Sequence, residues 1–282
     1  MRISDKYLIS NLFSKATLEL LTENDGHIQV ANNILKHLDV NYRALFDAYN
    51  SIYKMMMTGY RNEYVFKNAI AEKIIKGRHK MANVSYFTEF RVRKVIADCV
   101  VVNGSTSAYE IKTEFDTYNR LQNQLSFYKN AFEKVYVVVP ENDVKKLLIE
   151  ISDDIGVLSL TKKYTLNVVR EPTSNIDNLE HEIVFDCLNK NEIYNLTLKH
   201  FGFLPNVQPA FVRGECRKLF SQLPKSTIND EFRLALKSRH EILKHKESAY
   251  KIPSSLLSLL FTSNFSEKKY EKLIYNLNEV IA

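Results

Sequence analysis

The sequence predicts a mixed α/β fold: a central sheet with helices on its faces, extended at both ends by helical regions. Three observations support this prediction. Apolar residues recur at three- and four-residue spacing over residues 1–60 and again over 172–282, which is typical of helices that bury one face. Residues 61–171 instead alternate helix-like and strand-like segments in the order α-β-β-β-α-β, followed by further helix and strand. A hairpin followed by a helical crossover indicates a sheet with both antiparallel and parallel strands.

The elements of the middle region follow from local signals. NEYVFKNAIAEKIIKGRHK predicts a helix that begins after Asn62, and YFTEFRV alternates as a short strand does. VIADCVVVNG predicts an apolar strand that ends in the hairpin signal Asn103-Gly104, and SAYEIKTEF predicts the returning strand. The remaining segments are read in the same way, in this order: DTYNRLQNQLSFYKNAFEK as a helix, VYVVVP as a buried strand, NDVKKLLIEI as a helix, GVLSLT and TLNVVRE as strands.

Composition places the chain among globular proteins. Of its 282 residues, 45% are hydrophobic and 26% are charged, which suffices for a sizeable core. We expect a helical N-terminal extension over 1–60, a core over 61–171 and a mainly helical C-terminal region over 172–282. No apolar run approaches the roughly 20 residues of a membrane helix. The three cysteines are far apart and lack the spacing of metal ligands. We therefore expect a cytoplasmic protein with no membrane partner.

Charge points weakly to a polyanionic partner. The formal net charge is +6 and the pI is near 9.0, which favours contact with nucleic acid. A basic stretch near the C-terminus would suit phosphate contacts, although the solvated face of an amphipathic helix is the simpler interpretation. Its basic residues are Lys237, Arg239, Lys244 and Lys246.

The residues that carry chemistry lie in the predicted hairpin. Asp98 interrupts one apolar strand, and Glu110 and Lys112 interrupt the other, where charges are costly unless they are paired or bind a metal. Residues two apart on a strand point to one face, and counting back from the turn brings Asp98 roughly level with Glu110. Two carboxylates, with the Ile111 carbonyl between Glu110 and Lys112, suit Mg²⁺, and Mn²⁺ is expected to substitute. Structural ion pairs are the alternative interpretation.

The run ADCVVVNGSTSAYEIKTE resembles the core of the PD-(D/E)XK, or restriction-endonuclease-like, phosphodiesterases. Glu110-Ile111-Lys112 matches the second half of that motif, whereas the first half is Ala97-Asp98 in place of Pro-Asp. The resemblance implies an αβββαβ core, metal ligation by Asp98 and Glu110, and a role for Lys112 on the attacking water. Many members carry a further catalytic Glu on the preceding helix.

Glu63 is the matching residue for that further Glu, and Glu72 is a second candidate. An ordinary role for Glu63 at a helix N-terminus is the alternative. On the following helix, Gln124 and Tyr128 resemble the Gln-x-x-x-Tyr element of RecB-like and lambda-exonuclease-like branches. That likeness implies that the pair binds substrate or active-site groups. Arg120, one turn earlier, could contact a phosphate.

A closer resemblance is to a group of bacterial proteins that share a YRNEYVFKNAIA-like helix and an EIKTE run, and it covers residues 58–171. That group is associated with mobile elements and antiphage defence. Its members also carry a strand acid like Glu89, for which we expect a surface ion pair.

Together these observations predict a magnesium-dependent deoxyribonuclease, endo- or exonucleolytic, with DNA as partner. RNA cleavage is a weaker alternative, and a homodimer would suit the cutting of both strands. A non-catalytic nucleic-acid- or protein-binding module that keeps the fold is the competing class.

Overall fold

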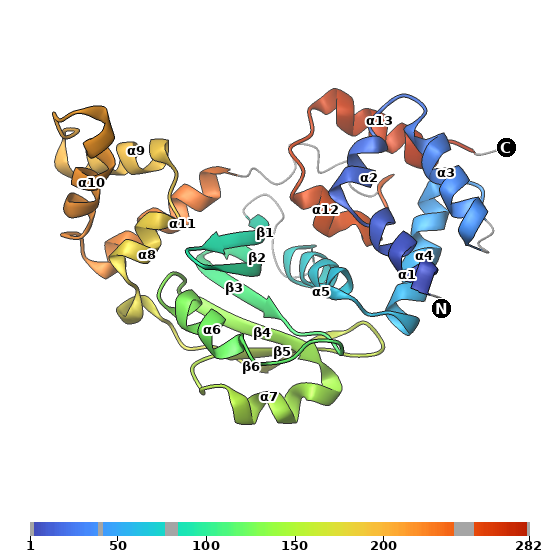
Figure 1. The fold of residues 1–282 in the computed structure, drawn as a ribbon, viewed down its shortest axis with the longest axis horizontal. Coiled ribbons are helices and arrows are strands. Elements are labelled where there is room, and N and C mark those ends of the chain that lie inside the picture. The colour runs from blue at the N-terminus through green and yellow to red at the C-terminus, as the bar shows by residue number, and fades with distance from the viewer. Residues whose placement is uncertain (1–2, 39–41, 77–83, 240–250, 281–282) are drawn as a thin grey trace.

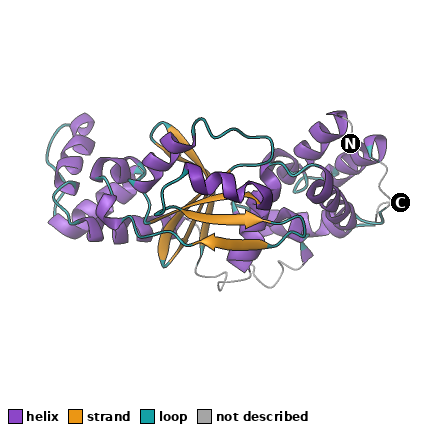
Figure 2. Ribbon diagram, turned by 90° about the horizontal axis from the view of Figure 1, so that it is seen from below, coloured by secondary structure: helices purple, strands orange, loops and turns teal. Residues whose placement is uncertain are grey.

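The computed structural model describes residues 3–38, 42–76, 84–239 and 251–280. A six-stranded sheet lies at the centre of an elongated molecule, and a group of helices lies at each end (Figure 1). The same arrangement is visible from below, with the strands between two helical groups (Figure 2). The predicted mixed α/β fold is therefore confirmed.

The core elements occur in the order that the sequence predicts: α5 (Glu63–Ile70), the π-helix η1 (Ala71–Lys76), β1 (Ser85–Val92), β2 (Val95–Asn103), β3 (Ser105–Ile111), α6 (Leu121–Lys129), β4 (Lys134–Pro140), the 3-10 turn η3 (Glu141–Asp143), α7 (Val144–Glu150), β5 (Gly156–Leu160) and β6 (Leu166–Arg170). The helix predicted from Asn62 onward differs in detail. Its α-helical part ends at Ile70 and continues as the π-helix, and the Asn62 side chain makes no capping hydrogen bond.

The strands lie side by side in chain order. β1, β2 and β3 pair antiparallel, β3, β4 and β5 pair parallel through the crossovers of α6 and α7, and β6 returns antiparallel. At the β2–β3 turn Asn103 pairs with Ser105, and Gly104 between them has a φ of +76°, which glycine adopts without strain. The predicted hairpin and mixed sheet are both present.

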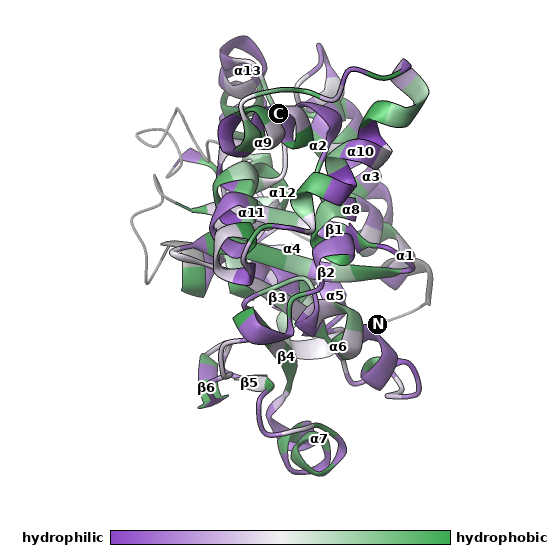
Figure 3. Cartoon of the chain, turned by 90° about the vertical axis from the view of Figure 1, so that its left-hand side faces the viewer, coloured by the Kyte–Doolittle hydropathy of each residue, from purple (hydrophilic) through white to green (hydrophobic). Residues whose placement is uncertain are grey.

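The sheet separates two hydrophobic cores. Along β4, Val135, Val137 and Val139 face one core, while Tyr136 and Val138 face the other. This alternation explains why VYVVVP is apolar throughout, since both faces of the strand are buried. Hydrophobic residues follow the strands, and polar residues follow the outer parts of the helices (Figure 3).

The first core lies between the sheet and the N-terminal helices, which are α1 (Ile3–Leu12), α2 (Lys15–Leu20), α3 (Gly26–His37) and α4 (Leu45–Gly59). The second core lies under α6 and α7 and extends into the helices at the other end of the molecule, which follow the turn η4 (Ile176–Asn178): α8 (His181–Asp186), α9 (Lys190–Phe201), α10 (Pro209–Phe220) and α11 (Lys225–Arg239).

The C-terminal part of the chain returns to the first core. The turn η6 (Ser254–Leu256) leads into α12 (Leu257–Phe261), which packs on α5 and η1, and α13 (Glu267–Asn278) packs on α3 and α4. The sequence predicts residues 172–282 as one mainly helical region. In the structure, α8 to α11 belong to the second core, whereas α12 and α13 belong to the first. No helix in the described parts of the chain is long and apolar enough to cross a membrane.

Asn68 joins α5 to this returning segment. It is fully buried, its Nδ2 donates to the Ser254 carbonyl at 2.9 Å, and its Oδ1 accepts from the Ser258 backbone N–H at 2.9 Å. Through these two bonds the C-terminal segment holds the helix that carries Glu63.

We expect Asn68→Ala to lower the free energy of unfolding by about 2–4 kcal/mol, because two buried backbone groups lose their partner. Urea denaturation followed by circular dichroism measures this change. The matched control is Asn142→Ala, at an exposed position, which should stay within about 0.5 kcal/mol of the wild type. An equal effect of the two substitutions would contradict this role of Asn68.

Candidate active site

Three acidic residues lie in a row across strands β1, β2 and β3. The register pairs Thr88 with Cys99 and Phe90 with Ala97, which places Glu89 level with Asp98. The β2–β3 ladder ends at the pair Cys99 and Tyr109, and one further step along this register places Asp98 opposite Glu110. Like charges directly across a sheet destabilise it, so this row needs compensation by cations or protons.

The strands are irregular at this row. Glu89 has a φ of +56°, a left-handed conformation that is uncommon for residues other than glycine. Phe87 and Phe90 face the same core although they lie three residues apart, and so do Ala97 and Val100. The alternation of side chains between the two faces of the sheet is therefore interrupted on β1 near Glu89 and on β2 near Asp98. Regular alternation, on which the sequence prediction relied, does not hold at Asp98.

Asp98 contacts the backbone of the neighbouring strand. Its Oδ2 accepts a hydrogen bond of 2.6 Å from the Ile111 N–H, beyond the end of the ladder. Burial, followed by the charges of Glu110 and Glu63, raises the pKa of Asp98 to about 8, and the Ile111 N–H offsets only part of this shift. Burial and the neighbouring acids together thus outweigh the Ile111 N–H and the Lys67 charge, which lower the pKa of Asp98.

Glu110 is almost fully buried and is held from two sides. Its Oε1 accepts from Lys112 Nζ at 2.6 Å, and its Oε2 lies 2.8 Å from the Tyr128 hydroxyl. Burial raises the pKa of Glu110 despite the opposing effects of Lys112, Tyr128 and Gln124. The Tyr128 hydroxyl also lies 2.7 Å from the Ile96 carbonyl. One phenolic proton cannot serve two acceptors fully, so a proton on Glu110 would satisfy both contacts.

Helix α6 supplies the remaining groups of this cluster. Gln124 Oε1 accepts from Lys112 Nζ at 3.1 Å, and Tyr128, one turn later, reaches Glu110. The i,i+4 spacing places both side chains on the face of α6 that packs against the sheet. The structure thus brings together Asp98 with Glu110, Lys112, Gln124 and Tyr128.

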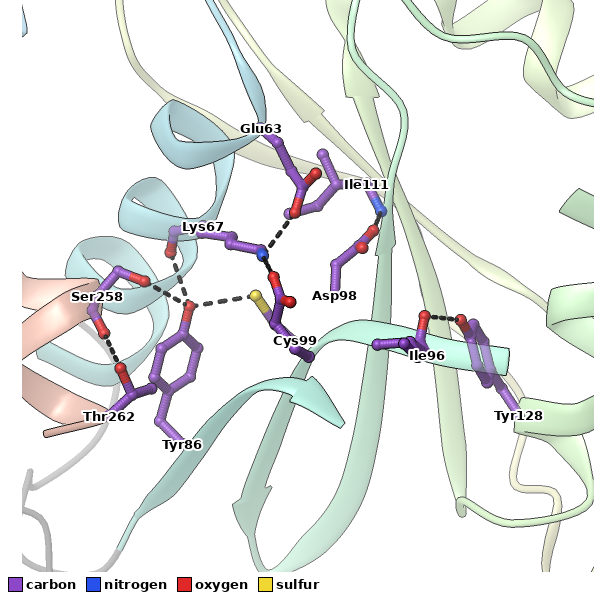
Figure 4. Close-up of polar contacts among 11 residues, drawn as sticks. Glu63, Lys67, Tyr86, Ile96, Asp98, Cys99, Ile111, Tyr128, Ser258 and Thr262 are labelled. Atoms are coloured by element: carbon purple, nitrogen blue, oxygen red, sulfur yellow. Dashed lines mark hydrogen bonds and ion pairs between the residues drawn. The ribbon is translucent and has the colours of Figure 1, made fainter. Parts of the chain in front are cut away.

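Glu63 approaches the cluster from the other face of the sheet. It is the first residue of α5, half of its side chain is exposed, and its charge contributes to the raised pKa of Asp98. Figure 4 shows Glu63, Asp98 and Ile111 close together between α5 and the strands. Glu72, the second candidate, pairs with Lys73 at 3.4 Å, and its charge acts on Tyr53 and Tyr164. The geometry therefore favours Glu63.

Lys67 is the site residue that the sequence analysis missed. Its Nζ lies 2.5 Å from Glu63 Oε1 and 2.7 Å from Glu89 Oε1, and its side chain is buried. Burial alone would lower the pKa of Lys67, but Glu63 and Glu89 more than offset burial and the pKa is raised. Glu89, for which a surface ion pair was expected, makes that pair with Lys67. The i,i+4 spacing of Glu63 and Lys67 was the available signal.

Among the described residues, those predicted to contact phosphate make no hydrogen bond or ion pair with the cluster. Arg120 is exposed at the start of α6, and among the described residues no hydrogen bond or ion pair joins its side chain to the cluster. Arg239 is bound to Glu192 and to the Cys187 carbonyl, and Lys237 is half-buried on the same helix. Lys244 and Lys246 lie outside the described residues.

The oxygen donors of the cluster are two carboxylates and a backbone carbonyl, which are ligand types that Mg²⁺ takes in proteins. Within residues 3–38, 42–76, 84–239 and 251–280, no three His, Cys, Asp or Glu side chains group as metal ligands. Mg²⁺ commonly takes one or two carboxylates and completes its shell with water and substrate phosphate. Because the Lys112 N–H bonds to β4, the alternation of the strand directs the Ile111 carbonyl toward β2, where Asp98 lies. Asp98, Glu110 and the Ile111 carbonyl are thus the groups that could hold the ion.

The fold and the residue cluster together define the class: an α/β protein whose site contains carboxylates and lysine at the end of the β2–β3 ladder. The chain belongs to the family described as Bacteriophage P4 protein cII, whose sequence profile matches residues 56–259, most of the chain. The matched range includes all the residues of the cluster.

Two individual proteins are similar to this chain. Protein cII of Enterobacteria phage P4 is 40% identical over 62 residues, which cover 22% of this chain and 24% of the phage protein. The similarity thus spans about a quarter of that relative's length. A protein of unknown function from Silicibacter pomeroyi aligns in structure over 62% of this chain and 94% of its own, with 16% identity and a TM-score of 0.30. That TM-score is too low to imply a shared fold.

The raised pKa of Asp98 gives a prediction for the metal-free protein. The folded chain retains a proton on Asp98 up to about pH 8, whereas the ordinary value is 3.8, so the stability of the wild type falls as pH rises between these two values. Asp98→Asn removes this loss and keeps an oxygen that can accept from the Ile111 N–H. In EDTA at pH 8 we expect the variant to melt about 2 °C or more above the wild type, with a smaller difference near pH 4.

Differential scanning calorimetry at both pH values measures the two melting temperatures. Asp230→Asn, at an exposed position of α11, is the matched control and should leave the melting temperature unchanged. An Asp98→Asn protein less stable than the wild type at pH 8 would show that the carboxylate stabilises the fold, contrary to this account.

Proposed function

We propose that the protein is a divalent-metal-dependent nuclease that hydrolyses phosphodiester bonds of DNA. The observation that carries the proposal is the meeting of Asp98, Glu110 and Lys112 at the end of the β2–β3 ladder. Burial raises the pKa of both carboxyls, and the charge of Glu110 adds to the shift at Asp98. A purely structural ion pair would be complete with Lys112 and Glu110 alone, and Asp98 would not be needed. A second acid that holds a proton for lack of a cation is costly to the fold, and such groups concentrate at functional sites.

The chain's own groups have separate tasks in this proposal. Bound Mg²⁺ would polarise a phosphoryl oxygen and lower the pKa of its water. Asp98 and Glu110 would hold the ion, and Tyr128 fixes the orientation of the Glu110 carboxyl through its 2.8 Å contact. Lys112, held by Glu110 and Gln124, would stabilise the negative charge that builds on the phosphoryl oxygens as water adds and the P–O bond breaks. Glu63, near Asp98, would act through a water.

Context and partners belong to the same proposal. The family description names a phage protein, which supports a role in mobile-element biology. Antiphage defence is proposed from the sequence resemblance alone. DNA is the proposed partner because the chain is basic and the donor set suits phosphate chemistry. We include a homodimer for the case in which both strands are cut. The proposed setting is the cytoplasm.

The direct test is nuclease activity with purified protein. Supercoiled plasmid, linear duplex, single-stranded DNA and RNA are each incubated with Mg²⁺ or Mn²⁺, so that the panel separates endonuclease from exonuclease and DNA from RNA. We expect cleavage of DNA that EDTA abolishes and that Asp98→Ala and Lys112→Ala each reduce at least about 100-fold. Lys73→Ala, which removes a half-buried lysine paired with Glu72, is the matched control and should retain activity.

Two results would contradict the proposal. Cleavage that survives both Asp98→Ala and Lys112→Ala would place the chemistry elsewhere. Retention of DNA without cleavage under either metal would instead support the competing class, a binding module that keeps the fold.

A further inference from the structure

The Lys67 ammonium lies among three carboxylates on the α5 side of the site. It contacts Glu63 at 2.5 Å and Glu89 at 2.7 Å, and its charge lowers the pKa of Asp98. The two contacting acids are largely exposed, at 50% and 67% of their side chains, whereas only 10% of the Lys67 side chain is exposed. A buried cation is thus surrounded by acids that open toward solvent.

The position of Lys67 is fixed by buried neighbours. The Tyr86 hydroxyl donates to the Lys67 backbone carbonyl at 3.1 Å and lies 3.1 Å from both Cys99 Sγ and Ser258 Oγ. Tyr86 itself is fully buried. Figure 4 shows this contact on one side of Lys67, with its ammonium pointing toward Glu63 and Asp98 on the other side. The backbone at Lys67 is therefore held by Tyr86 of β1, which also contacts Ser258 of α12.

The ammonium of Lys67 contacts carboxylates of the kind that a second divalent cation would need as ligands. Two-metal phosphodiester sites hold their ions roughly 3.5–4 Å apart, which requires carboxylates beyond those that hold the first ion. Among the described residues near Asp98, Glu63 and Glu89 are the carboxylates that remain once Glu110 is assigned to the first ion. Glu63 and Glu89 both contact the Lys67 ammonium. The ammonium carries a single positive charge, whereas a divalent metal ion carries two.

We infer that Lys67 takes the place of a second metal ion, so that the site binds a single divalent cation held by Asp98 and Glu110. The inference rests on the proposed metal-dependent function. It assigns to Lys67 the role of a positioning residue, which sets the stoichiometry of the metal and holds Glu63 beside Asp98. Glu63 is then bound to an ammonium rather than to a metal ion.

The test counts bound ions in the full-length protein. Mn²⁺ is titrated by isothermal calorimetry and by the electron paramagnetic resonance signal of the free ion. The wild type should bind one Mn²⁺, and Lys67→Met, which keeps the length of the side chain but removes its charge, should bind two. Lys67→Arg, which keeps the charge, should bind one. Lys73→Met is the matched control and should also bind one.

Lys67→Met should fold, because the acids it leaves unpaired are half or more exposed, and far-ultraviolet circular dichroism checks this. Glu63→Gln gives a second measurement that does not depend on the lysine variant. Since Lys67 holds Glu63, the wild-type stoichiometry of one should persist in Glu63→Gln. Loss of the ion in that variant would overturn the inference.

The remaining outcomes are distinct. Two ions in the wild type, or a single ion in a folded Lys67→Met protein, would overturn the role of Lys67 and leave the proposed nuclease function standing. Absence of any Mn²⁺ binding by the wild type would overturn the proposed function, and this inference with it.

Discussion

The placement of half-buried Asp98 beside buried Glu110, where the β2–β3 ladder ends, is the constraint on which the rest of the site depends. Burial raises the pKa of both carboxyls, and the charge of Glu110 adds to the shift at Asp98. The neighbouring groups oppose these shifts. Lys112 pairs with Glu110, the Ile111 N–H donates to Asp98, and Lys67 lowers the pKa of Asp98 from the other side. Because the pKa of both carboxyls stays raised, a proton or a further cation would stabilise the pair.

The sheet permits this arrangement because both of its faces are buried. Helix α5 covers one face and carries Glu63 and Lys67, and helix α6 covers the other and carries Gln124 and Tyr128. The site lies between these helices, beyond the last β2–β3 backbone pair. There the Ile111 N–H bonds to the Asp98 side chain and not to the backbone of β2. The C-terminal segment stabilises one half of the site, since α12 packs on α5 and Asn68 bonds to that segment. Residues of β1 and of the C-terminal segment thus hold the helix that carries Lys67.

The local parts of this site could be predicted from the sequence. The turn at Asn103 and Gly104 set the hairpin register, and the spacing of Glu110 and Lys112 placed them together. Lys67 could not be identified in this way, because Glu and Lys four residues apart are common on solvated helix faces. Its backbone is held by Tyr86 of β1, which also contacts α12, and both elements lie far from it in the sequence. Its second partner, Glu89, has a positive φ, and no sequence pattern predicts that conformation. The return of residues 254–278 to the N-terminal helices is likewise a tertiary effect.

The central claim is that the acid pair at the end of the ladder is a divalent-cation site. The most direct measurement is an anomalous difference map from a crystal of the protein grown or soaked with Mn²⁺. The account predicts one peak, between the carboxylates of Asp98 and Glu110 and beside the Ile111 carbonyl, with the Lys67 ammonium still bound to Glu63. A map without a peak there, with Lys112 still paired to Glu110 at saturating Mn²⁺, would contradict it.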